Sequence, residues 1–101
     1  MSNEISEYQL NNLIQQQVPF VFFSMVEGEI EGDWQKTFSQ SVPVREFVEI
    51  MQHIQTKGLD MQYPLVLCCQ DGKTSKKIAK KLESEGFINV YVVAGGYNKL
   101  I

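Results

Sequence analysis

Hydrophobic and polar positions divide the chain into short apolar runs that alternate with amphipathic stretches. Residues 20–23, 65–69 and 89–93 are predominantly apolar, which is typical of strands buried on both faces of a sheet. Residues 75–85 and the stretch after Pro43 instead space their apolar side chains three and four positions apart, as on one face of a helix. The pattern therefore predicts strands that alternate with helices.

Two helices have recognisable ends. Ser6 is followed three residues later by Gln9, the spacing of a capping box, so we expect a first helix that runs to about Gln17. The helix after Pro43 should end near Gly58. Its apolar stripe is formed by Val44, Phe47, Val48, Met51 and Ile54. His53 falls on the opposite side of this stripe, and we expect it to face solvent.

Residues 27–40 fit neither period, and we predict a long polar loop. Its acidic part, Glu27 to Asp33, superficially resembles a calcium-binding loop, but such loops prefer Asp and need Glu at the twelfth position, where this chain has Phe38. A solvated loop is the interpretation that we adopt. We expect Trp34 to pack on the core rather than to cover a site, because large aromatic side chains usually anchor loops.

Strands that alternate with helices, each strand apolar throughout, predict right-handed crossovers and a mostly parallel sheet covered on both faces. We therefore expect a three-layer α/β/α fold with a sheet of about four to five strands. The 101 residues, 44% of them hydrophobic, are enough for one core without disulfides or metals. We predict a single domain over residues 1–101.

Charge and hydropathy narrow the choice of partners. The formal net charge is −3, so the chain lacks the overall basic charge of a nucleic-acid-binding protein. No apolar run reaches membrane-spanning length, and the first residues lack the basic start and apolar segment of a secretory signal. We expect a cytoplasmic protein that binds neither nucleic acid nor membrane.

The two cysteines, Cys68 and Cys69, are adjacent, which excludes a disulfide framework. A zinc site needs about four ligands in spaced pairs, and two abutting thiols with one histidine cannot supply them. We therefore expect no metal. Neighbours on a strand face opposite sides of the sheet, so we expect Cys68 in the core and Cys69 at the end of the strand, facing a crevice.

The stretch "CCQDGKTS", which contains both cysteines, suggests an anion site. Gly72 lets the backbone turn, and we expect the next helix to begin at Thr74 or Ser75, so that several N–H groups point into one concavity. If the anion is the sulfur of Cys69, the same field favours the thiolate, which is the nucleophilic form. Lys73 adds a positive charge within the turn.

Five lysines lie on one face of the helix that follows. They are Lys73, Lys76, Lys77, Lys80 and Lys81. Lysines at a helix start and glutamates at its end oppose the macrodipole, at about 0.3–1 kcal/mol per well-placed charge. A solvated face is the ordinary explanation, and an anionic ligand at the turn is the alternative.

The segment from Tyr63 to Leu100, "YPLVLCCQDGKTSKKIAKKLESEGFINVYVVAGGYNKL", resembles the rhodanese-like domain family. It has an apolar strand that ends in Cys, a CxxGx(R)S loop, a helix and a "GF.NVY...GGY" close. The resemblance implies the rhodanese-like fold, with a five-stranded parallel sheet flanked by helices.

The resemblance also implies a sulfurtransferase, or persulfide carrier. Cys69 would attack a small sulfur-containing anion such as thiosulfate, carry the sulfur as a persulfide, and pass it to a thiol or cyanide acceptor. A protein sulfur acceptor is a further candidate partner, and the chemistry needs no metal or organic cofactor. The implied binding residues are those of the loop: Gln70, Asp71, Gly72, Lys73, Thr74 and Ser75.

The first half of the chain departs from the family pattern. It lacks the Asp and Arg that usually end the first strand and the "GHIPGA" signature. Thr74 stands where active relatives often carry Arg. Lys73, one position earlier, could replace that charge, although a lysine is a point charge and binds an oxyanion more loosely than a guanidinium fork.

Three other interpretations remain. A cysteine phosphatase would need Arg where Ser75 stands. The phosphocysteine domains of sugar phosphotransferase systems carry a similar loop after their first strand, whereas about sixty residues precede it here. The main alternative is a weakly active or inactive rhodanese-like binding or regulatory module. The missing family residues favour it, and the retained Cys69, Gly72 and basic helix face oppose it.

Overall fold

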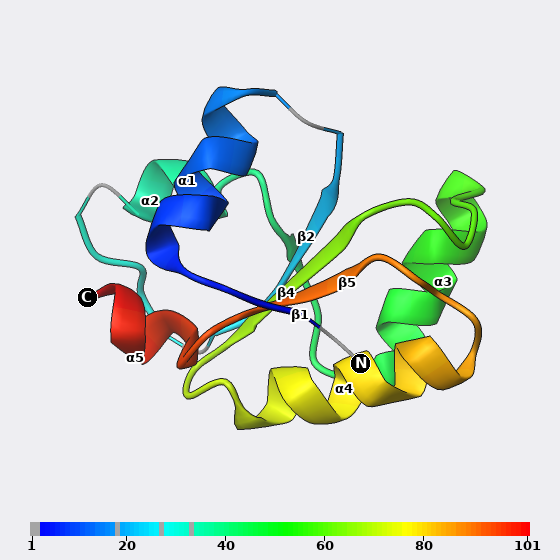
Figure 1. The fold of residues 1–101 in the computed structure, drawn as a ribbon. Coiled ribbons are helices and arrows are strands. Elements are labelled where there is room, and N and C mark those ends of the chain that lie inside the picture. The colour runs from blue at the N-terminus through cyan, green and yellow to red at the C-terminus, as the bar shows by residue number, and fades with distance from the viewer. Residues whose placement is uncertain (1–2, 18, 27, 33) are drawn as a thin grey trace.

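The computed structural model describes residues 3–17, 19–26, 28–32 and 34–101. A five-stranded sheet lies between two layers of helices (Figure 1). The strands are β1 (Asn3–Ile5), β2 (Val21–Met25), β3 (Val42–Pro43), β4 (Leu65–Cys69) and β5 (Val90–Val93). The helices are α1 (Glu7–Gln15), α2 (Trp34–Phe38), α3 (Phe47–Lys57), α4 (Lys73–Ser84) and α5 (Gly96–Leu100).

All strand pairs are parallel, in the order β1-β5-β4-β2-β3. The apolar strand β4 is central, and all five of its residues are buried. It pairs with β2 on one side and with β5 on the other. The predicted three-layer α/β/α fold with a parallel sheet is confirmed, and Cys69 ends its central strand.

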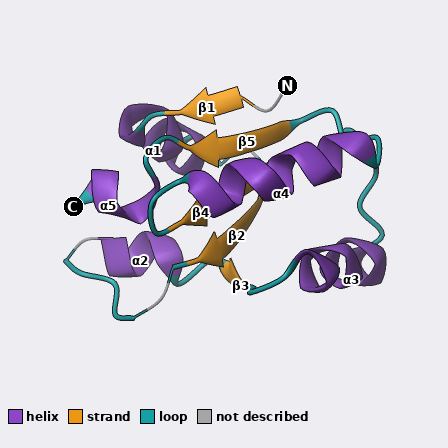
Figure 2. Ribbon diagram, turned by 90° about the horizontal axis from the view of Figure 1, so that it is seen from below, coloured by secondary structure: helices purple, strands orange, loops and turns teal. Residues whose placement is uncertain are grey.

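The two faces of the sheet form two separate cores. Leu65 and Leu67 pack under α3 and α4, whereas Val66 and Cys68 pack on the other face against α1, α2 and α5. Figure 2 shows the two helical layers on either side of the strands. This division follows from the alternation of side chains along each strand. The predicted burial of Cys68 in the core is confirmed.

The two edge strands were not recognised in the sequence. β1 has three residues, of which only Ile5 is buried, and β3 has two. Such short strands carry no apolar run, and their shortness also limits unwanted pairing at the edges of the sheet. No helix in the described part of the chain is long and apolar enough to cross a membrane.

The prediction of a loop over residues 27–40 is wrong for residues 34–38, which form α2. Trp34 packs on the core as expected. Its ring lies edge-on to Phe38 with centroids 6.5 Å apart, and its Nε1 donates to the carbonyl of Leu100 at 3.1 Å. Five residues are too few for a helical period to be visible in the sequence. Glu27 and Asp33, the ends of the acidic segment, lie outside the described residues.

The predicted helices occur with small shifts. The capping box is present, with Ser6 N–H donating to Gln9 Oε1 at 2.8 Å and Gln9 N–H to Ser6 Oγ at 3.2 Å, but α1 ends at Gln15, two residues earlier than expected. In α3, Val48 is 52% exposed and Ile50 takes the buried position. His53 was expected to face solvent, but it is only partly exposed, because its ring packs edge-on against Phe23.

Leu10 tests how much the α1 layer contributes to stability. Leu10 is fully buried, so Leu10→Ala should lower the free energy of unfolding by about 2–5 kcal/mol through lost burial and a residual cavity. Tyr8→Ala on the same helix, at a site 74% exposed, should change it by less than about 0.5 kcal/mol. Urea unfolding measures both, and equal effects would contradict the assigned packing.

Candidate functional site

The loop after β4 folds around the sulfur of Cys69. Cys69 Sγ accepts hydrogen bonds from the backbone N–H of Gly72 at 3.0 Å and of Ser75 at 3.3 Å. Gly72 has a φ of 89° and caps α4, which begins at Lys73, one or two residues earlier than expected. The helix start therefore directs its free amides at the sulfur, as the sequence predicted.

The start of α5 supports this loop from behind. The N–H of Asn98 donates to the carbonyl of Gln70 at 3.0 Å, and the two side chains are hydrogen-bonded at 2.8 Å. Gly96 has a φ of 66°, and a Cβ at this position would collide with the Cys69 carbonyl and lie 2.6 Å from the Gly72 nitrogen. A glycine is therefore required for α5 to approach the loop this closely.

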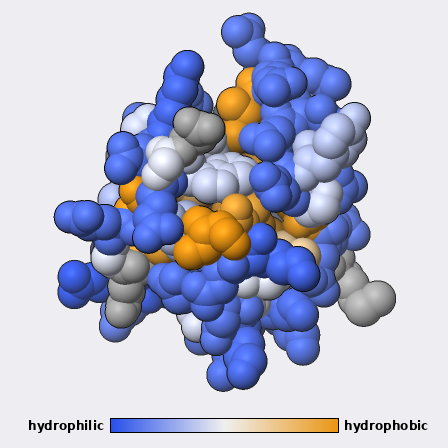
Figure 3. Space-filling model, turned by 90° about the vertical axis from the view of Figure 1, so that its left-hand side faces the viewer, coloured by the Kyte–Doolittle hydropathy of each residue, from blue (hydrophilic) through white to orange (hydrophobic). Residues whose placement is uncertain are grey.

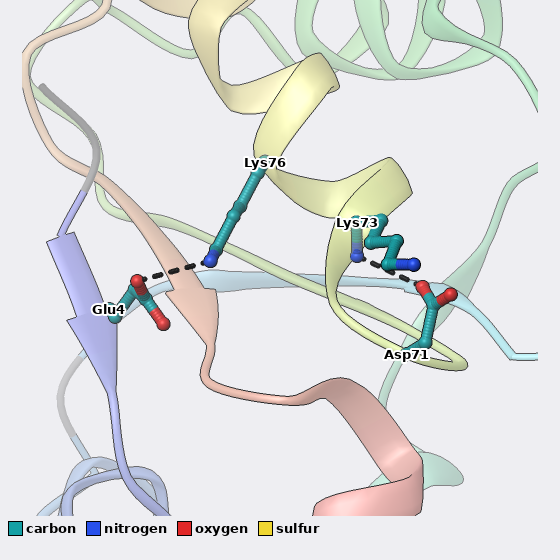
Figure 4. A network of polar contacts seen from close by, with 4 residues as sticks. All are labelled: Glu4, Asp71, Lys73 and Lys76. Carbon is teal, nitrogen blue, oxygen red and sulfur yellow. Dashed lines mark hydrogen bonds and ion pairs between the residues drawn. The ribbon is translucent and has the colours of Figure 1, made fainter.

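Asp71 brings a carboxylate to the same sulfur. Its Oδ1 lies 3.8 Å from Cys69 Sγ and also accepts the N–H of Lys73 at 2.9 Å (Figure 4). The hydrogen bond from the Lys73 amide is the main cause of the lowered pKa of the Asp71 carboxyl. This carboxyl is therefore ionised at neutral pH. The sulfur thus has two N–H donors and one negative charge as close neighbours.

Cys68 has a different environment from its neighbour. It is fully buried in the core against α1, α2 and α5. Burial, and secondarily the neighbouring Cys69, raises the pKa of the Cys68 thiol to about 12. Cys68 is therefore a neutral core residue at physiological pH.

A cleft of about 960 Å³ opens beside Cys69. Gln70, Asp71 and Thr74 line it from the loop and the first turn of α4. The other walls come from the end of β2 and from the segment between β3 and the first turn of α3, and they include Met25, Val26, Val44, Arg45 and Glu49. Figure 3 shows the side of the molecule that carries α2 and α5, where hydrophilic residues surround a central patch of apolar ones.

Arg45 and Glu49 were missed as cleft residues. They follow β3, and because that two-residue strand gave no apolar run, nothing in the sequence placed them at the carboxyl edge of the sheet. Lys73, in contrast, is exposed and is not among the described residues that line the cleft. Among the residues that the structure describes, Arg45 is therefore the cationic residue that lines the cleft.

Part of the basic face of α4 has structural partners. Lys76 Nζ lies 3.3 Å from Glu4 Oε1 of β1 (Figure 4), and the ammonium of Lys81 lies 5.7 Å from the centroid of the Phe47 ring. These contacts account for two of the five lysines without any ligand. No group of three or more His, Cys, Asp or Glu side chains that could hold a metal ion occurs among the described residues.

A comparison with models of protein families identifies one family. A family model described as "Rhodanese-like domain" matches residues 6–101. A comparison with curated protein sequences finds no match.

Three solved structures share the fold at low sequence identity. A protein from Staphylococcus saprophyticus subsp. saprophyticus has a TM-score of 0.69 and 17% identity, and the match covers 100% of this chain and 94% of that chain. The polysulfide-sulfur transferase homodimer of Wolinella succinogenes has a TM-score of 0.66 and 17% identity, with 97% and 72% covered. A rhodanese homolog from Thermus thermophilus has a TM-score of 0.62 and 20% identity, with 93% and 95% covered.

Gly96 offers a test of the support from α5. Gly96→Ala should destabilise the protein by about 1–3 kcal/mol beyond the strain of a left-handed alanine, because its Cβ collides with the loop backbone. Gly58→Ala is the matched control, since Gly58 has a φ of 65° and open space around it. Urea unfolding compares the two, and equal losses would show that α5 does not press on the loop.

The buried thiol of Cys68 predicts a dependence of stability on pH. Below pH 9.0 the folded and unfolded chains both keep this proton, but between 9.0 and about 12 the unfolded chain loses it while the folded chain retains it. The free energy of unfolding of the wild type relative to Cys68→Ala should therefore fall with rising pH, by up to about 1.4 kcal/mol per unit. Urea unfolding from about pH 8 to about pH 11 measures the difference. A constant difference would refute the assigned burial.

Proposed function

The chain belongs to the rhodanese-like domain family, and on that premise we propose that it is a sulfurtransferase that carries sulfane sulfur on Cys69. The observation that carries the proposal is the pair of backbone N–H donors, from Gly72 and Ser75, directed at the Cys69 sulfur. Such donors stabilise a thiolate and, after transfer, a negatively charged persulfide.

The reaction that we propose has two displacement steps. The Cys69 thiolate attacks the outer sulfur of a donor such as thiosulfate, the S–S bond of the donor breaks, and sulfite leaves with the electron pair. An acceptor thiolate or cyanide then attacks the outer sulfur of the Cys69 persulfide and releases the Cys69 thiolate. Each step balances without an oxidant, a metal or an organic cofactor.

The loop residues have distinct roles in this proposal. Gly72 and Ser75 contribute their amides, whereas Gln70, Asp71 and Thr74 present side chains to the cleft where the donor enters. Lys73 contributes charge from the rim. Ser75 is fully buried, and its Oγ has no hydrogen-bond partner among the described residues. An anion in the loop would supply that partner, and a buried hydroxyl without one is costly.

The acceptor in the proposal is a small thiol or a thiol of another protein, which the open cleft leaves room to reach. Both cysteines are free, as a persulfide carrier requires, and a reducing cytoplasm is the setting that we propose. The polysulfide-sulfur transferase of Wolinella succinogenes, whose name states a related chemistry, shares the fold and supports the same class of reaction.

Mass spectrometry of the purified protein tests this function directly. After incubation with thiosulfate or an organic persulfide, we expect an adduct of about 32 Da on Cys69, because the persulfide is the covalent intermediate of the proposed reaction. Excess thiol or cyanide should remove the adduct and yield the sulfurated acceptor.

Variants of the two cysteines complete this experiment. Cys69→Ser should abolish both the adduct and the transfer of sulfur, whereas Cys68→Ala, which changes only the core, should retain them. Transfer that survives Cys69→Ser would refute the nucleophile. An intact Cys69 that takes up no sulfur from any donor would favour the alternative of a binding or regulatory module with an idle cysteine.

A further inference from the structure

We propose that Asp71 selects the sulfur donor by its charge, and that the donor is an organic persulfide, R–S–SH, rather than a small inorganic dianion such as thiosulfate. The inference rests on the proposed function and concerns the donor of that same site. It follows from where the loop holds one carboxylate and from the charges on the other walls of the cleft.

The carboxylate of Asp71 is fixed beside the reacting atom. Its Oδ1 lies 3.8 Å from Cys69 Sγ, and the N–H of Lys73 holds the same oxygen at 2.9 Å. A donor must place its outer sulfur against Cys69 Sγ, so the rest of the donor passes close to this carboxylate. Two unit charges about 4 Å apart change a rate or an equilibrium about fivefold even at the dielectric constant of water. A dianion is therefore disfavoured at this position.

The other walls of the cleft carry a mixed set of charges. At the start of α3, Glu49 Oε1 accepts the backbone N–H of Arg45 at 2.9 Å and that of Glu46 at 3.1 Å. The guanidinium of Arg45 has no ion pair with the described residues. Arg45 lines the cleft, and its guanidinium suits a carboxylate on the tail of a donor, away from the reacting sulfur.

The size of the cleft agrees with a donor that has a tail. Its volume of about 960 Å³ lies near the upper end of the range of about 300–1,000 Å³ found for small-molecule sites. Met25 and Val26 are partly exposed, and they give the cleft an apolar side that suits the organic group of a donor. An amino-acid or short-peptide persulfide has the matching chemistry, because it offers a carboxylate to Arg45 and an outer sulfur that can hold a proton beside Asp71.

The sulfur transfer balances for this donor. The Cys69 thiolate attacks the outer sulfur of R–S–SH, a bond forms between Sγ and that sulfur, and the donor S–S bond breaks. The R–S⁻ group leaves with the electron pair and takes up a proton as it becomes a thiol. The Asp71 carboxylate can accept a hydrogen bond from the protonated outer sulfur, and this protonated form is the one that a thiolate attacks.

Alkylation with two reagents of different charge isolates the role of Asp71. Iodoacetamide is neutral and iodoacetate is anionic, and both react with the same thiolate, so the ratio of their rates at Cys69 cancels the amount of thiolate present. Asp71→Asn keeps the oxygen that accepts the Lys73 N–H and should raise the iodoacetate-to-iodoacetamide ratio about fivefold.

Glu49→Gln and Arg45→Gln serve as comparisons for that ratio. Glu49→Gln removes a negative charge from the opposite wall while keeping an oxygen for the backbone, so it should raise the ratio by less than about twofold. Arg45→Gln should lower the ratio. A ratio that Asp71→Asn leaves unchanged, or that Glu49→Gln raises as much, would overturn the role of Asp71.

A comparison of donors separates this inference from the proposed function. Wild-type protein should take sulfur from cysteine persulfide with a higher kcat/KM than from thiosulfate. Asp71→Asn should lower the ratio of these two values about fivefold or more, because it raises kcat/KM for thiosulfate. Equal use of both donors by the wild type would overturn the inference and leave the sulfurtransferase intact. Uptake from neither donor would overturn the proposed function itself.

Discussion

The sulfur of Cys69 accepts hydrogen bonds from the amides of Gly72 and Ser75, and the rest of the site depends on these two contacts. They exist because β4 is the central strand of a parallel sheet and ends where the first turn of α4 has unpaired N–H groups. Gly96 lets α5 press against the loop, and the bonds between Gln70 and Asn98 hold it there. The start of α4 thus directs two backbone amides at one thiol.

The chemistry of the site depends on opposing electrostatic effects at one atom. Backbone dipoles from the loop and from α4 favour a negative sulfur, whereas the carboxylate of Asp71 opposes it from 3.8 Å. The amides are part of the fold, but Asp71 is an exposed side chain, and Asn in its place would keep the oxygen that accepts the Lys73 N–H. In the proposed reaction, reactivity and the choice of donor can therefore vary on the same scaffold, and Arg45 on the opposite wall adds a second variable charge.

Much of the fold could be predicted from the sequence because the central strands are buried on both faces. β2, β4 and β5 appear as apolar runs, and the Ser6 capping box marks α1. The edge strands β1 and β3 were missed, since strands of three and two residues carry no periodic pattern. α2 was missed for the same reason, and the half-buried position of His53 against Phe23 depends on how α3 packs on the sheet.

The candidate site could also be predicted only in part from the sequence. The loop and Cys69 are contiguous in the sequence, so this part of the site could be predicted from local sequence alone. The far wall of the cleft, with Arg45 and Glu49, comes from a separate segment of the chain that β3 brings to the same edge of the sheet. Only the pairing of β3 with β2 places it there, and a single sequence does not reveal that pairing. Both cysteines are buried, but strand alternation alone separates the core-facing thiol of Cys68 from the loop-facing thiol of Cys69.

The most direct test of the central claim follows the two amides themselves. In a series of ¹H–¹⁵N spectra recorded across pH, the amides of Gly72 and Ser75 should show one shared step as Cys69 loses its proton, and Cys69→Ser should remove that step from both. Amide signals of Gly72 and Ser75 that do not respond to the ionisation of Cys69, or that respond equally in Cys69→Ser, would contradict the account.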